Sequence, residues 1–221
     1  KMGSEEVVFR STKNEKHPRD DKKIMEEMWA LLDSADIVIG QNSDRFDIPK
    51  IYARMMFQRV NDRHPPSSFK RIDTKKIAKK YFGFTYNSLE HLCDYLDVKY
   101  KKLKHDKFPG MSLQVECLNG NAEAWAEMER YNVRDILALE ECWKEMRAWD
   151  SSINANLYHG SKKSVCRVPG CGGALQSHGH HYTSAGKFQR YRCGSCGAEA
   201  RGRENLLSKK KKAGLKLGVP R

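Results

Sequence analysis

The distribution of apolar and polar residues divides the chain near residue 150. Before that point, apolar residues recur at helical spacing in some segments and form short continuous runs in others. The segments predicted as helices are 19–35, 48–60, 74–83, 87–98 and 121–149, the last as one long helix or two in succession. The runs predicted as strands are 5–11, 36–42 and 70–74, of which 36–42 suits a buried parallel strand. Because strands and helices alternate, residues 1–150 predict an α/β domain with helices packed on a sheet.

Local signals support several of these helix starts. Asp20 or Asp21 can cap the first helix. Pro49 falls in the first turn of the second helix, where its missing N–H costs nothing. Asn87 or Ser88 can cap the fourth helix.

Beyond residue 150 the chain is polar, basic and rich in turn residues. We expect a linker over 151–164, a small zinc-ribbon module over 165–203 and a basic tail over 204–221, of which residues 209–221 are expected to be disordered. The net charge of the whole chain is +13, and residues 151–221 contain 14 Lys and Arg against two acids. The first 150 residues are nearly neutral, with 27 basic and 26 acidic residues. This asymmetry favours a polyanionic partner, most simply nucleic acid, over the alternative of a solubilising tail.

The seven cysteines fall into two groups with different predicted roles. Cys93, Cys117 and Cys142 lie in apolar segments and are expected to be buried thiols. The other four are paired as C-x4-C and C-x2-C, a spacing that predicts a closed tetrahedral zinc site, and they are Cys166, Cys171, Cys193 and Cys196. His178, His180 and His181 offer alternative ligands or are exposed loop residues.

Basic and aromatic residues alternate between the two cysteine pairs. Lys187, Arg190, Arg192 and Tyr191 are candidate nucleic-acid contacts, because cations can meet phosphates while aromatic faces stack on bases. The alternative is an ordinary hairpin whose aromatic residues pack on the metal-binding turns. Lys102 and Lys104, in a basic loop before the long helix, are further candidates for guiding a strand.

Acidic residues at the ends of predicted elements form a second candidate site. Asp47 and Asp73 follow predicted strands, where ligand sites of α/β sheets form, and Asp135 comes from the long helix. Three such acids could converge on divalent metal, and Tyr131, one helical turn before Asp135, could orient an attacking water. Each residue also has a simpler interpretation: Asp47 and Asp73 as helix caps, Asp135 as a surface acid and Tyr131 as a core aromatic.

Three segments of this part of the chain resemble the DnaQ-like 3′–5′ exonucleases of the DEDDy type, in the ribonuclease H-like superfamily. The segments are "ADIVIGQNSDRFDIPKIYARMM", "RIDTKKIAKKYFGFTYNSLEHLCDYLDV" and "AWAEMERYNVRDILALEECW". The resemblance covers residues 1–150, and its nearest variety is a phage-type exonuclease with a C-terminal zinc ribbon.

The resemblance implies a ribonuclease H-like mixed sheet flanked by helices, with two catalytic Mg²⁺ or Mn²⁺ ions. It implies that Asp47 and Asp135 are metal ligands, that Tyr131 positions the water and that Asp73 is a third acid near the site. Asn42 and Phe46 complete the Asn-x-x-x-Phe-Asp motif and are expected to contact nucleic acid.

One motif of that family is absent. Its Asp-x-Glu pair on the first strand has no counterpart in this sequence, and Glu5 and Glu6 are adjacent, so they would point to opposite faces of a strand. We therefore expect the domain to be N-terminally incomplete, and this chain to be impaired as an enzyme.

The leading hypothesis is a metal-dependent 3′–5′ exonuclease acting on DNA, or RNA, with a structural Zn²⁺ in its ribbon. Its expected partners are single-stranded DNA or 3′ ends and a DNA polymerase or replication complex. The alternatives are a non-catalytic nucleic-acid-binding protein and a transcription-associated zinc-ribbon factor. No apolar run is long enough to span a membrane, and no secretory signal is present, so a cytoplasmic location in a bacterial or phage-infected cell is expected.

Overall fold

The computed structural model describes residues 6–15, 17, 20–101, 107–158 and 165–218, and it divides into two compact units after Met146. The architecture is mixed α/β, with one parallel and one antiparallel sheet. The segment 151–158, expected as part of a linker, belongs to the second unit. There the Ala155 amide donates to the Arg167 carbonyl at 2.7 Å, and the Asn156 side chain donates to the Val165 carbonyl at 2.7 Å.

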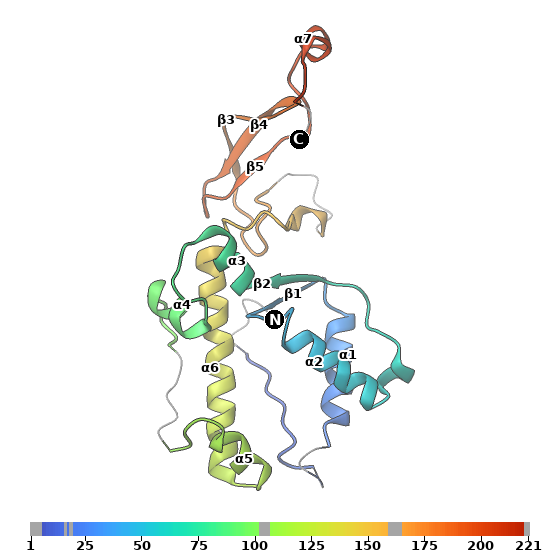
Figure 1. Ribbon diagram of the computed structural model, residues 1–221, viewed down its shortest axis with the longest axis vertical. Coiled ribbons are helices and arrows are strands. Elements are labelled where there is room, and N and C mark those ends of the chain that lie inside the picture. The colour runs from blue at the N-terminus through green and yellow to red at the C-terminus, as the bar shows by residue number, and fades with distance from the viewer. Residues whose placement is uncertain (1–5, 16, 18–19, 102–106, 159–164, 219–221) are drawn as a thin grey trace. The chain divides into compact units, whose positions relative to one another are not determined.

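The first unit places helices around a two-stranded parallel sheet (Figure 1). Its elements are α1 (Lys22–Asp33), β1 (Ile37–Gly40), α2 (Asp47–Phe57), the 3-10 turn η1 (Val60–Arg63), β2 (Lys70–Asp73), α3 (Thr74–Tyr81), α4 (Leu89–Tyr95), α5 (Ser112–Leu118) and α6 (Ala122–Met146). The helices predicted from periodicity are all present, and the last is one continuous helix. The short α5 was not predicted.

Strands β1 and β2 pair in parallel, from Ile37 opposite Lys70 to Gly40 opposite Asp73. The strand predicted over 5–11 is wrong for its described part, because residues 6–11 form no strand. A strand needs a hydrogen-bonded neighbour, and within the described residues β1 and β2 pair only with each other. For the same reason β1 is half-buried along its length, whereas the sequence predicted a buried strand.

Two groups of helices hold this unit together. Helices α1 and α2 pack on each other, while α3, α4 and α5 each contact the long helix α6 (Figure 1). Asp21 lies at the N-cap position of α1 but makes no cap hydrogen bond. Instead its carboxylate accepts two hydrogen bonds from Arg54, at 2.5 and 2.6 Å, and so ties α1 to α2. Ser88 does cap α4, as predicted, through the His91 amide at 3.4 Å.

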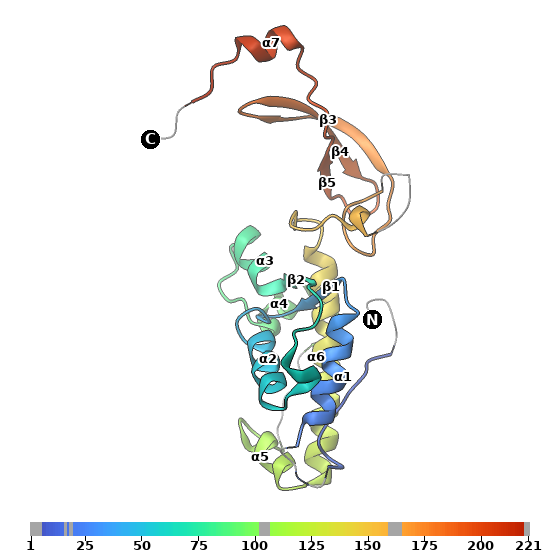
Figure 2. The same cartoon turned by 90° about the vertical axis from the view of Figure 1, so that its right-hand side faces the viewer.

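The second unit is an antiparallel three-stranded sheet with a helical turn on either side in the chain. Its elements are η2 (Ala155–Leu157), β3 (Leu175–Thr183), β4 (Gly186–Cys193), β5 (Glu199–Arg201) and α7 (Lys209–Gly214). Figure 2 shows β3 and β4 as a long hairpin with the short β5 beside it. The prediction of a disordered tail is wrong over 209–214, where Ser208 caps α7 by accepting from the Lys211 amide at 3.2 Å.

Candidate functional site

The four clustered cysteines form a pocket of sulfur atoms that fits one metal ion. All four Sγ atoms lie within 4.8 Å of one another. The distance from Cys166 to Cys196 is 3.5 Å, and that from Cys171 to Cys193 is 3.7 Å. Four sulfurs at the Zn–S distance of about 2.3 Å in a tetrahedron lie about 3.8 Å apart, so the pocket has the dimensions of a closed zinc site.

Backbone amides donate to two of the four sulfurs, and the pKa is lowered at Cys193, whereas burial raises the pKa of Cys166 and Cys196. The Val168 amide donates to Cys166 Sγ at 3.5 Å, and the Ser195 amide donates to Cys193 Sγ at 3.4 Å. Burial raises the pKa of Cys193, but the amides of Cys196 and Ser195 and the neighbouring thiols outweigh burial and lower the pKa to about 6. These N–H donors are fixed by the two tight turns and stabilise negative sulfur.

A glycine makes the close approach between the two turns possible. A Cβ added at Gly173 would lie 2.6 Å from both Cys193 Sγ and Ser195 Oγ, closer than real Cβ contacts allow. The role of Gly173 could not be predicted from the cysteine spacing, because it depends on how closely the turn at Cys193 and Ser195 approaches in the folded chain. Gly170, Gly172 and Gly197 have φ values of 67°, 63° and 73°, a left-handed conformation that glycine adopts without strain.

The two faces of the three-stranded sheet carry different sets of candidate contacts. Arg190 and Arg192 alternate with Tyr191 on β4, so they share a face with Phe188. Arg201 of β5 pairs with Arg190 and joins that face, with its guanidinium 4.3 Å from the centre of the Phe188 ring. The sequence did not single out Arg201, because its place depends on the strand register.

The opposite face of this sheet carries Lys187 and Tyr191 of β4, and Tyr182 of β3 pairs with Lys187. The Lys187 ammonium lies 6.0 Å from the centre of the Tyr182 ring. Within the described residues, the apolar cluster around the cysteines contains none of the hairpin aromatics. The alternative in which these rings pack on the metal-binding turns is therefore not what the structure shows.

In the first unit, Asp73 acts as a buried anchor for the turn between β1 and α2. Its side chain accepts from the Asn42 amide at 2.9 Å, the Asp44 amide at 3.3 Å and the Lys75 amide at 3.0 Å. The Lys75 bond makes Asp73 the N-cap of α3, as one of the two sequence interpretations predicted. The bond from Asn42, whose φ is 60°, holds a turn conformation that few residues adopt.

Asp47 and Phe46 follow this turn at the start of α2. Asp47 is exposed and is the first residue of α2, while Phe46 occupies the N-cap position, so the interpretation of this acid as the cap does not hold. Partial burial of the carboxyl raises the pKa of Asp47, its own backbone amide offsets part of that rise, and the charge of nearby Asp73 adds to it. The Phe46 ring is 58% exposed beside Asp47.

Tyr131 and Asp135 share one face of α6 and are joined by a hydrogen bond. Burial raises the pKa of Tyr131 to about 12, with further contributions from the charge and hydrogen bond of Asp135 and the charge of Glu90. The phenol is therefore neutral at physiological pH, and it donates its one hydroxyl hydrogen to the Asp135 carboxylate while its oxygen can still accept a hydrogen bond.

The candidate carboxylates do not converge into one compact group. Within the described residues, the four cysteines are the only His, Cys, Asp and Glu side chains that gather, three or more together, within 4.8 Å. Asp47 and Asp73 lie close enough to interact electrostatically. Carboxylate oxygens such as those of Asp47 and Asp135 are the ligands that Mg²⁺ and Mn²⁺ prefer, so the donor chemistry fits such an ion. The two-ion site itself stays a prediction.

The candidate contacts Lys102 and Lys104 lie outside the described residues. No helix in the described part of the chain is both long enough and apolar enough to cross a membrane. Comparisons with protein-family models, with curated proteins and with solved structures find no match for this chain.

Proposed function

We propose that this protein is a metal-dependent 3′–5′ exonuclease of the DnaQ-like, DEDDy type, with a ribonuclease H-like first unit and a zinc ribbon that binds nucleic acid. The observation that carries the proposal is the hydrogen-bonded pair of Tyr131 and Asp135 on α6. A neutral phenol held by a carboxylate one turn away is suited to position a water molecule. Asp47, at the carboxyl end of β1, supplies an exposed carboxylate of the kind a divalent cation binds.

In this proposal the side chains have distinct roles. Asp47 and Asp135 would hold the divalent ion, which supplies charge relief on the phosphoryl oxygens and acidifies a bound water. Tyr131 orients that water through its hydroxyl, and Phe46 stacks on a base near the 3′ end. Asp73 is a positioning residue, since its side chain holds the turn that leads to Asp47.

The zinc ribbon supplies sequence-independent affinity. Arg190, Arg192 and Arg201 on one face can each neutralise a phosphate, and Phe188 on the same face is held by Arg201. The polymerase partner and the preference for DNA follow only from the resemblance to the exonuclease family.

The experiment that tests catalysis uses a 5′-labelled single strand of DNA with Mg²⁺ or Mn²⁺. A ladder that shortens from the 3′ end would support catalysis, and it should then disappear in Asp47→Ala and Asp135→Ala. The matched control is Asp36→Ala, which removes an exposed carboxylate at the opposite end of β1. A ladder that persists in both site variants would exclude these acids as metal ligands.

A second candidate function, binding nucleic acid without cleavage, is favoured by two observations. The sequence contains no Asp-x-Glu pair, and the Asp73 side chain already accepts three amide hydrogen bonds. If the wild-type chain binds the strand in a salt-dependent way but forms no ladder, this second function replaces the first.

A further inference from the structure

Five aromatic rings form a continuous surface array on the first unit. They are Phe82, Phe84, Tyr86, His91 and Tyr95, which we call the aromatic array. Phe84 stacks on Phe82 and on Tyr95, with ring centres 5.2 Å apart in each case and interplanar angles of 12° and 16°. His91 continues the array, with its ring 6.2 Å from Tyr95 and 4.7 Å from Tyr86.

The local sequence explains how the rings come together. Helix α3 ends at Tyr81, and Phe82 is extended, with φ −128° and ψ 141°. Three rings then alternate with smaller residues up to the Ser88 cap of α4. His91 and Tyr95 are four residues apart on α4 and share one of its faces. Leu92 and Cys93 are the buried residues of α4, so the helix packs on the core through them and not through the His91 and Tyr95 rings.

The aromatic array is partly exposed to solvent. Tyr86 is 59% exposed and Tyr95 is 45% exposed, while the other three rings are half-buried. Offset stacking leaves part of each ring face uncovered. Large apolar surfaces left in water usually mark a site of contact with another molecule.

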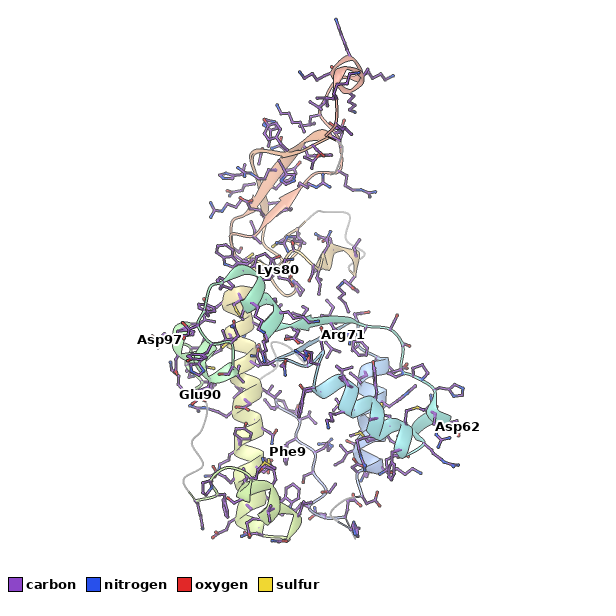
Figure 3. The ribbon with its side chains drawn as sticks, in the orientation of Figure 1. Phe9, Asp62, Arg71, Lys80, Glu90 and Asp97 are labelled. Atoms are coloured by element: carbon purple, nitrogen blue, oxygen red, sulfur yellow. The ribbon has the colours of Figure 1, made fainter. Side chains whose placement is uncertain are left out.

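The charges around the array favour a polyanion as that molecule. Residues 70–101 contain eight Lys and Arg against four acids, and two of these cations, Arg71 and Lys76, form ion pairs with Asp44 outside this range. Of the acids, Asp73 is buried, and Asp94 and Asp97 both lie near the ammonium of Lys101, at 3.5 and 3.4 Å. Lys79 and Lys80 are exposed in the last turn of α3, and Tyr81, whose ring centre lies 4.8 Å from the Lys80 ammonium, separates them from Phe82. Figure 3 labels Lys80 on α3 and Glu90 on α4, the two helices that the array connects.

We propose that the aromatic array binds single-stranded nucleic acid, with unpaired bases stacked on Tyr86 and Tyr95 and phosphates at Lys79 and Lys80. This combination of ring faces and cations is how proteins hold single strands without reading sequence. The inference rests on the proposed function, in which the protein acts on nucleic acid, and adds where the first unit holds the strand. Glu90, next to His91 on α4, lies near enough for its charge to contribute to the raised pKa of Tyr131.

The test measures the Kd of a fluorescein-labelled 12-nucleotide oligo-dT by anisotropy, without divalent ions so that no cleavage occurs. An abasic strand of the same length serves as a second probe, because it keeps the phosphates and lacks the bases. Tyr86→Ala and Tyr95→Ala should each weaken oligo-dT binding roughly 5- to 150-fold, the range for loss of one stacked base. Binding of the abasic strand should not change.

Two further variants separate stacking from folding. Tyr86→Phe and Tyr95→Phe keep the ring and should bind oligo-dT as the wild type does. Tyr52→Ala removes a tyrosine that is 37% exposed on α2, outside the array, and should also leave the Kd unchanged. Far-UV circular dichroism checks that each alanine variant is folded.

The outcomes distinguish this inference from the proposed function. If the alanine variants bind oligo-dT as tightly as the wild type, the inference is wrong, and the array is a packing or protein-contact surface. Weaker binding in those variants, together with an inactive wild-type enzyme, would support the array and reject only catalysis. If no form of the protein binds either strand, both proposals fail.

Discussion

Replacing Asp73 tests whether this acid is an anchor for the fold or a ligand for metal. Asp73 is 5% exposed, and its side chain accepts hydrogen bonds from the amides of Asn42, Asp44 and Lys75. In Asp73→Ala the loss of the α3 cap costs about 1 kcal/mol. The other two amides, left without their acceptor, cost about 1 kcal/mol each. The expected destabilisation is therefore about 3 kcal/mol.

Urea unfolding followed by tryptophan fluorescence measures this loss, because Trp143 is buried in the same unit. For a unit of this size, about 3 kcal/mol corresponds to a fall of roughly 6–12 °C in melting temperature. Asp73→Asn keeps one acceptor oxygen and should lose about half as much, since one amide then faces a donor. The control Asp36→Ala should unfold at the wild-type urea concentration.

The same experiment with and without Mg²⁺ separates the two roles of Asp73. An anchoring carboxylate gives the same loss of stability under both conditions. If Asp73 instead binds the metal, Mg²⁺ should increase the stability of the wild type, and this increase should be absent in Asp73→Ala. An Asp73→Ala variant that unfolds with the wild-type midpoint would refute the anchoring argument.

Three further results are expected. Ultraviolet titration should show a tyrosine with a pKa of about 12, and this tyrosine should be missing from the titration of Tyr131→Phe. Because folding raises the pKa of Tyr131, its contribution to the free energy of unfolding is complete below about pH 10 and falls as the pH rises to about 12. Gly173→Ala should lower zinc content measured by mass spectrometry of metals, while Gly218→Ala, whose Cβ would meet open space, should not. Zinc chelation, or Cys193→Ser, should unfold the second unit and leave the unfolding of the first unit unchanged, as limited proteolysis would show.

Features that depend on neighbouring residues in the sequence were predictable. The apolar spacing along α6 and the Ser88 cap of α4 are local, and both are present in the structure. The strand predicted over 5–11 failed because strand formation depends on a partner elsewhere in the chain. The basic tail was expected to be disordered from its charge, but the Ser208 cap is enough to start the short helix α7.

The two candidate sites also differ in how far they depend on residues that are distant in the sequence. The four-cysteine pocket was predictable because each cysteine pair sits on one tight turn, so the approach of two turns is enough to bring all four sulfurs together. The role of Asp73 was only half predictable. Its bond to Lys75 spans two residues, whereas its bonds to Asn42 and Asp44 span 31 and 29 residues and depend on the pairing of β1 with β2.

Salt dependence separates the two proposed nucleic-acid contacts on physical grounds. For a single strand, each phosphate contact contributes a slope of about −0.7 in log K against log salt, so raising salt fourfold weakens binding roughly 2.6-fold per contact. Replacing Arg190, Arg192 and Arg201 should therefore flatten the salt dependence. The weakening of binding over the fourfold rise in salt should become smaller by up to about 18-fold. Stacking on Tyr86 and Tyr95 involves no counterion release. Their alanine variants should shift the whole curve to weaker binding without changing its slope, and a changed slope would mean that these rings act through neighbouring charges.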